Sequence, residues 1–129
     1  MTIKIKNVDL RTTPIRTRMP FRYGIATLTE APYLMVFADF DVDGEAVRGV
    51  SADILPPKWF TKDPAASLEA EIGDMAAVIR RAAELSLDVG PRPSVYQWWR
   101  DLHRLQTADE SLQRHPPLLK GFGVSLLER

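Results

Sequence analysis

The stretch Tyr33-Leu34-Met35-Val36-Phe37-Ala38-Asp39-Phe40-Asp41-Val42-Asp43-Gly44 carries the clearest secondary-structure signal in the chain. Every second residue of it is apolar, which is the period of a β-strand with one buried face. The face predicted to be buried consists of Leu34, Val36, Ala38, Phe40 and Val42. Asp43-Gly44 predicts a hairpin turn, because glycine accepts the positive φ that such turns require.

The sequence on either side of this strand predicts two neighbouring strands. Residues 45–54 are expected to return from the turn as a strand with Val50, Ala52 and Ile54 on one face. At the amino end, the apolar alternation that begins at Ile3 is out of phase by Val8. A β-bulge near Asn7 would restore a single apolar face, because one extra residue resets the alternation. Together the strands predict an antiparallel meander.

The segment 13–32 is expected to be a long loop between the first two strands. Long connections in compact domains usually carry a function. This one combines arginines with aromatic and aliphatic side chains, namely Arg16, Arg18, Phe21, Arg22, Tyr23 and Ile25. Such a combination of side chains indicates either a surface that binds an anion or a nucleic-acid strand, or an ordinary solvated loop.

The second half of the chain predicts helices. Asp63-Pro64 is expected to open the first helix, as a carboxylate cap followed by proline at the first helical position. An apolar stripe at helical spacing then runs from Leu68 to Ala82. Ser94 is expected to cap a second helix that packs Trp98-Trp99 into the core, and a short helix precedes a last one at 118–129. The fold class predicted is α+β, a three-stranded antiparallel β-meander followed by a bundle of three to four helices in a single domain.

Composition excludes several classes of protein. Seventeen Lys and Arg balance seventeen Asp and Glu among the 129 residues, and nucleic-acid-binding domains usually show a basic excess instead. The chain has no cysteine, which excludes disulfides, thiolate metal sites and thiol nucleophiles. It has neither a signal-peptide pattern nor the ~20 apolar residues of a membrane helix, so we expect a soluble, cytoplasmic protein without nucleic-acid or membrane partners.

No complete catalytic or metal-binding motif is present. Asp39-x-Asp41-x-Asp43-Gly44 imitates the start of an EF-hand loop, but Val50 occupies the twelfth position, where a bidentate Glu is required. His103 and His115 are the only histidines, and their separation is not that of a metal-binding pair. Gly121-x-Gly123 lacks the third glycine of a phosphate-binding loop. We therefore expect no catalytic residue and no metal ligand in this chain.

Taken together, these segments resemble the amino-terminal capping domain of the mandelate racemase/muconate lactonizing enzyme group of the enolase superfamily. The resemblance spans residues 1–129 and depends on the order and character of the elements. It is carried by Pro20-Phe21-Arg22-Tyr23-Gly24, the strand from Tyr33, the Asp43-Gly44 turn and the terminal run GFGVSLLER at 121–129. The chain departs from the group at the end of the third strand, where Arg48-Gly49-Val50-Ser51-Ala52 replaces the Gly-x-Gly-Glu-like ending often seen there.

The resemblance implies a role. In that group the capping domain closes two loops over a carboxylate substrate, and these loops correspond here to about residues 17–28 and 51–60. The substrate-binding residues implied are Arg18, Phe21, Arg22, Tyr23, Ile25, Ile54 and Trp59. Mg²⁺ and the acid/base residues of the racemases, cycloisomerases and dehydratases belong to a carboxyl-terminal barrel domain. A barrel needs roughly 200 or more residues, so we expect it to be absent from this chain, which should be inactive by itself.

The partners expected are therefore the barrel domain of the full-length enzyme, a small carboxylate substrate and further copies of the same chain. A second interpretation, which needs no family, is a stand-alone α+β module. That module would bind a small ligand or a protein through the arginine and aromatic side chains of residues 16–28.

Overall fold

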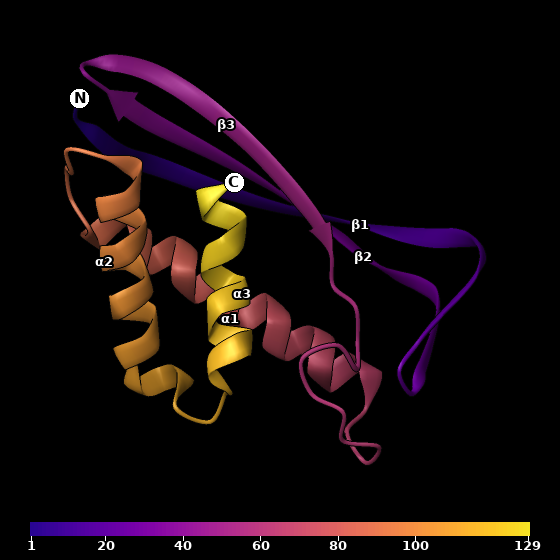
Figure 1. Cartoon of the computed structure of the whole chain (residues 1–129). Helices are drawn as coiled ribbons and strands as arrows, with labels where there is room; N and C mark the ends of the chain where they lie inside the picture. The colour runs from indigo at the N-terminus through magenta and orange to yellow at the C-terminus, as the bar shows by residue number, and fades with distance from the viewer.

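The computed structural model describes residues 1–129 and contains one antiparallel sheet with the strand order β1-β2-β3. The strands are β1 (Ile3–Tyr23), β2 (Ala26–Val42) and β3 (Glu45–Ile54). The turn between β2 and β3 has positive φ at Asp43 (52°) and Gly44 (87°), as the sequence predicted. Three helices follow and lie on one side of the sheet (Figure 1). The α+β class and the meander are confirmed.

The prediction of a long loop at residues 13–32 is wrong, because this segment forms a two-stranded antiparallel ribbon. Register pairs continue from Thr13–Tyr33 to Tyr23–Ala26, where a tight turn with Gly24 at φ 51° closes the hairpin. Figure 1 shows this hairpin extending well past the helices. The segment contains prolines, of which Pro14 and Pro32 form a register pair, and each strand of a two-stranded ribbon has a free edge, where proline is tolerated.

Two irregularities interrupt the pairing of β1 with β2. One lies between Ile5 and Asn7 and is the bulge that the phase change predicted. The other lies between Arg16 and Phe21, where β1 advances five residues while β2 advances two, from Glu30 to Leu28. The extra residues of β1 bend the strand and increase its twist before the hairpin tip.

Helix α1 (Leu68–Asp88) begins later than expected. Its N-cap is Ser67, whose Oγ accepts a 3.1 Å hydrogen bond from the Ala70 N–H, whereas Asp63 accepts from the Ala65 N–H in the turn before it. Both residues satisfy backbone donors in the same way, so the sequence alone could not choose between them. Helix α2 (Val95–Ala108) is capped by Ser94 as predicted, with a 3.1 Å bond from the Gln97 N–H.

A short 3₁₀ helix, η1 (Glu110–Leu112), and the last helix, α3 (Pro117–Glu128), complete the chain. None of the helices combines the length and the apolar character that crossing a membrane requires. The core lies between the helices and one face of the sheet. Its members include Leu34, Val36, Ala38, Met75, Ile79, Ala82, Trp98, Leu102, Val124 and Leu126. Trp98 is thus in the core as expected, while Trp99 is only half-buried.

The other face of the sheet is not covered by helices. The register pairs Val50 with Phe37 and Ala52 with Met35. Phe37 and Met35 alternate along β2 with its buried residues, so all four side chains lie on the face opposite the core. Val50 is 54% exposed. The apolar face predicted for β3 therefore exists, but it lies outside the core.

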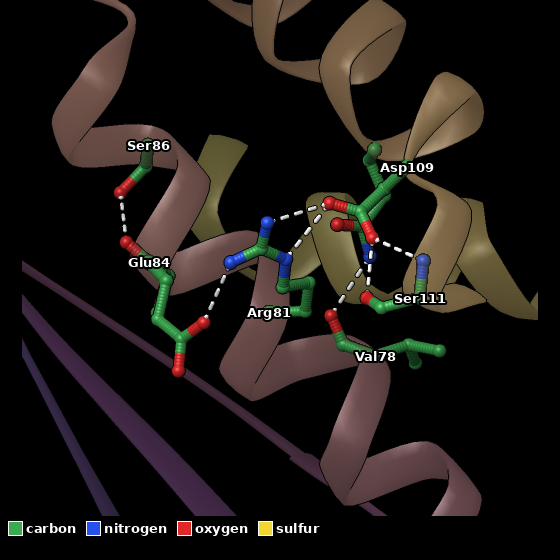
Figure 2. Close-up of polar contacts among 8 residues, drawn as sticks. Val78, Arg81, Glu84, Ser86, Asp109 and Ser111 are labelled. Carbon is green, nitrogen blue, oxygen red and sulfur yellow. Dashed lines mark hydrogen bonds and ion pairs between the residues drawn. The ribbon is translucent and has the colours of Figure 1, made fainter.

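A polar cluster joins the helices at the end distant from the sheet (Figure 2). Arg81 of α1 donates from Nε to Asp109 Oδ2 at 2.8 Å and from Nη1 to Glu84 Oε2 at 2.9 Å. Asp109 also caps η1 by accepting from the Ser111 N–H. The hydrogen bonds from Ser111 and from Arg81 hold the pKa of Asp109 below its usual range. These contacts fix the turn between α2 and α3 against α1.

Candidate functional site

An open groove of about 880 Å³ lies between the hairpin tip, the loop after β3 and helices α2 and α3. Most of its surface is apolar. The hairpin, the end of β3 and the loop after it contribute Phe21, Tyr23, Leu28, Ile54, Pro56, Trp59 and Phe60, and the helices contribute His103, Leu118 and Phe122. Its volume falls within the range of ~300–1,000 Å³ that is typical of small-molecule sites.

The structure brings together four of the seven residues predicted for substrate binding. Phe21 and Tyr23 of β1, Ile54 at the end of β3, and Trp59 in the following loop all line the groove. Arg18, Arg22 and Ile25 do not. Arg22 lies between Phe21 and Tyr23 in the strand, and successive side chains of a strand point to opposite faces. Arg18 lies in the irregular part of β1, and Ile25 is 61% exposed in the turn.

Aromatic side chains form one wall of the groove. The rings of Phe21 and Tyr23 stack with centroids 5.7 Å apart, and Trp59 meets Tyr23 edge-on at the same distance. The Tyr23 hydroxyl donates a 2.6 Å hydrogen bond to the carbonyl of Pro57. Burial raises the pKa of Tyr23, and the negative charge of Glu71 adds to this effect. The phenol therefore stays protonated and able to donate well into the alkaline range.

A buried ion pair between Lys58 and Glu71 fixes the loop that carries Trp59 to α1. Lys58 Nζ lies 3.0 Å from Glu71 Oε2, and both side chains are more than 90% buried. The same ammonium donates to the carbonyls of Asp63 and Ala66 at 2.7 and 2.5 Å, and Thr61 Oγ1 donates to the other Glu71 oxygen at 2.6 Å. Lys58 has a positive φ of 62°, a conformation that a non-glycine residue keeps only where its surroundings enforce it. The loop is thus a fixed part of the groove.

Sequence reasoning missed the residues that the helices supply. Phe122 of α3 packs on Phe60 with ring centroids 4.6 Å apart, and Leu118, one turn earlier, is 66% exposed at the rim. His103 of α2 lies against Trp99 with centroids 5.4 Å apart and reaches the groove from the opposite side. The available signal was the i, i+4 spacing of Leu118 and Phe122, which places both on one helix face.

Two charged side chains border the groove, and they neutralise each other. Arg129 Nη1 lies 3.0 Å from Asp53 Oδ2, which connects the end of the chain to the end of β3. The pair is partly exposed, so solvent screens it. The groove can therefore contribute apolar and aromatic contacts, one histidine, and an arginine that a ligand anion would have to share with Asp53.

The aspartates of the β2–β3 turn have partners within the protein. Asp39 pairs with Arg48 at 2.6 Å, Asp41 accepts from the Gly44 N–H at 2.9 Å, and Asp43 accepts from the Thr2 N–H at 2.6 Å. No three His, Asp or Glu side chains are arranged so that they could hold a metal ion. The carboxylates that imitated a calcium loop thus take part in local turn and ion-pair contacts.

The fold and the groove define the class of this protein as an α+β domain with an open, mainly apolar groove beside its hairpin tip. Comparison with protein families, curated proteins and solved structures gives no match. The family resemblance drawn from the sequence accordingly stays a prediction.

Proposed function

We propose that this chain is a substrate-capping domain of an Mg²⁺-dependent enzyme of the mandelate racemase/muconate lactonizing enzyme type, acting on a small carboxylate. One observation carries the proposal. The two segments that the resemblance assigns to the substrate, the hairpin tip and the loop after β3, form a single wall and are joined by the hydrogen bond from Tyr23 to Pro57.

In this role the chain supplies an apolar wall of fixed shape that keeps water out of the site. Phe21, Tyr23 and Trp59 present ring faces and edges to the groove, and neither Lys58 nor Glu71 is exposed there. An apolar wall of fixed shape excludes water from a site and thereby strengthens the electrostatic interactions within it. Mg²⁺ and the acid/base groups would come from a barrel domain. The chain by itself is expected to be inactive and to carry no cofactor.

The test joins this chain to the barrel of an enzyme of that group and follows α-proton exchange of a panel of carboxylates in D₂O by NMR. The chimera should exchange protons, and Trp59→Ala should change kcat/KM by different factors for different carboxylates. Val50→Ala, on the far face of the sheet, is the matched control. Exchange by the 129-residue chain alone would contradict the proposal, as would equal behaviour of the two variants on every substrate.

A stand-alone small-ligand module is the second candidate, and it is favoured by a specific observation: residues of this chain line a groove of about 880 Å³. The test is binding of aromatic carboxylates to the isolated chain, followed by Trp fluorescence. Under this candidate Phe21→Ala should weaken binding at least tenfold, because the ring forms part of the groove. If Arg22→Ala abolished binding while Phe21→Ala did not, the ligand would occupy the opposite face of the hairpin.

A further inference from the structure

The two edges of the sheet differ in how well they are protected against pairing with another strand. The β1 edge contains Pro14 and Pro20, several Lys and Arg side chains, and both irregularities of the sheet. Prolines, charges and bulges are the usual means by which proteins keep an edge strand unpaired. The β3 edge has no proline and no irregularity, and β3 pairs only with β2.

β3 also exposes a valine on each of its faces. Val47 pairs with Phe40 and therefore lies on the helix-facing side of the sheet, yet it is 47% exposed. Val50 lies on the opposite side and is 54% exposed. An edge strand with exposed apolar side chains on both faces favours association through that edge.

A hollow lies at Gly49 on the helix-facing side. A cavity of about 180 Å³ is lined by Ala38, Phe40, Gly49, Trp98 and Leu127, among others. Gly49 leaves it open towards the edge, since a Cβ built there would meet no atom within 4 Å. Glycine inside a strand often marks a place where another backbone approaches closely. The exposed side chain of Val47 and the hollow at Gly49 therefore lie on the same face of β3, two residues apart.

We propose that a second copy of this chain pairs with the first through β3, antiparallel, with the twofold axis at Arg48. This register sets Val47 opposite Gly49 of the partner subunit, and Gly49 opposite the partner's Val47. It also sets Val50 opposite Ala46 of the partner subunit. Each exposed valine then faces a small residue, and the contact is self-complementary, as a twofold interface must be. The inference does not rest on the proposed function.

The register places the two Arg48 side chains beside each other at the axis. Each guanidinium is already bound to Asp39 of its own chain, from Nε at 2.6 Å and from Nη2 at 2.9 Å. This pairing holds the pKa of Asp39 below its usual range, so the carboxylate keeps its charge. The centre of the interface therefore contains two Arg48–Asp39 ion pairs side by side. The positive charge of each arginine is neutralised by the aspartate of its own chain.

The test uses the absence of cysteine from the chain. Opposed residues of an antiparallel pair have Cα atoms roughly 4.5–5.5 Å apart, within the ~4.4–6.8 Å span of a disulfide. Arg48→Cys should therefore give a disulfide-linked dimer on oxidation. Val50→Cys, on the same exposed face, is the matched control. In this register its two copies are four positions apart, about 13 Å, and should not cross-link.

Sedimentation of the unmodified chain supplies the second measurement. It should show a monomer–dimer equilibrium, and Val47→Lys should weaken the dimer at least tenfold, because it places a charge at the apolar contact. Cross-linking of Val50→Cys in place of Arg48→Cys would overturn the register. A wild-type chain that stays monomeric at every concentration up to about 1 mM would overturn the interface itself, since a Kd above that value corresponds to less than about 4 kcal/mol of binding free energy.

Discussion

The hydroxyl of Tyr23 and the carbonyl of Pro57 form a 2.6 Å hydrogen bond between residues that are 34 positions apart in the sequence. Tyr23 is the last residue of β1, at the tip of a hairpin that extends beyond the helices (Figure 1). Pro57 belongs to the loop after β3, which Lys58 and Glu71 fix to α1. The bond therefore holds the free end of the hairpin against a rigid part of the domain, and the aromatic wall of the groove depends on it.

Removing this hydroxyl should loosen the wall. Tyr23→Phe keeps the ring but leaves the Pro57 carbonyl without its donor, so we expect the free energy of unfolding to fall by about 1 kcal/mol. Urea denaturation measures the loss, and faster amide exchange around the hairpin tip should accompany it. Tyr96→Phe is the control, because Tyr96 is 64% exposed and should change neither quantity.

The same phenol predicts a pH dependence. Its pKa in the folded protein lies above the ordinary value of 10.0. The stabilising contribution of the phenol is therefore complete below pH 10 and is lost as the pH rises through the folded pKa. Tyr23→Phe should remove this part of the alkaline loss of stability. Identical alkaline unfolding curves for the wild type and the variant would contradict the assignment.

Breaking the buried ion pair should be costly, whereas replacing both partners should cost less. Lys58→Met leaves the Glu71 carboxylate buried without its counter-ion, and we expect a loss of about 3–5 kcal/mol. The double variant Lys58→Met/Glu71→Leu removes both charges and should regain most of this loss. A double-mutant cycle by chemical denaturation measures the coupling. If the losses of the two single variants simply added up, the pair would not be interacting.

His115 should make the domain less stable in mild acid. Only 6% of its surface is exposed to solvent. Burial lowers its pKa, Arg114 and Lys120 lower it further, and Asp74 opposes them. Because the folded pKa lies below the ordinary value of 6.5, the neutral imidazole favours folding fully above pH 6.5, and this contribution is lost as the pH falls through the folded pKa. The midpoint of thermal unfolding should drop between pH 7.5 and 5 in the wild type and in His103→Gln. It should drop less in His115→Gln.

The two glycines of α3 should respond to alanine in opposite directions. A Cβ at Gly123 would overlap the Val78 carbonyl of α1 and lie 2.8 Å from Gln106 Nε2, so Gly123→Ala should cost about 2–3 kcal/mol. A Cβ at Gly121 meets nothing within 4 Å, and Gly121→Ala should gain about 0.5–1 kcal/mol from helix propensity. Thermal denaturation of the two variants side by side checks both signs. Equal destabilisation by the two variants would mean that α1 and α3 do not pack as closely as described.

Several elements could be predicted because their signals are local. The alternation from Tyr33 to Val42 and the Asp43-Gly44 turn place two strands, and the phase change near Asn7 reveals a bulge. The serine at 94 caps α2 because its side chain bonds a backbone N–H only three residues away. Such contacts involve neighbours in the sequence, so the pattern of residue types is sufficient to find them.

The ribbon at 13–32 and the groove could not be predicted in the same way. Whether prolines in a segment end a strand depends on whether that strand has a free edge, which is a property of the sheet. Phe21 and Trp59, which the sequence singled out, line the same groove, but His103 and Phe122 come from helices whose position is decided by core packing.

The sequence by itself determined the class of fold and its order of elements, because periodicity and turn chemistry act over a few residues. Only the tertiary structure decided which face of each element is covered. It separated Arg22 from its neighbours Phe21 and Tyr23, left Val50 outside the core, and set Lys58 against Glu71. The physical reason is that burial depends on the contacts of the whole chain, and no single segment contains that information.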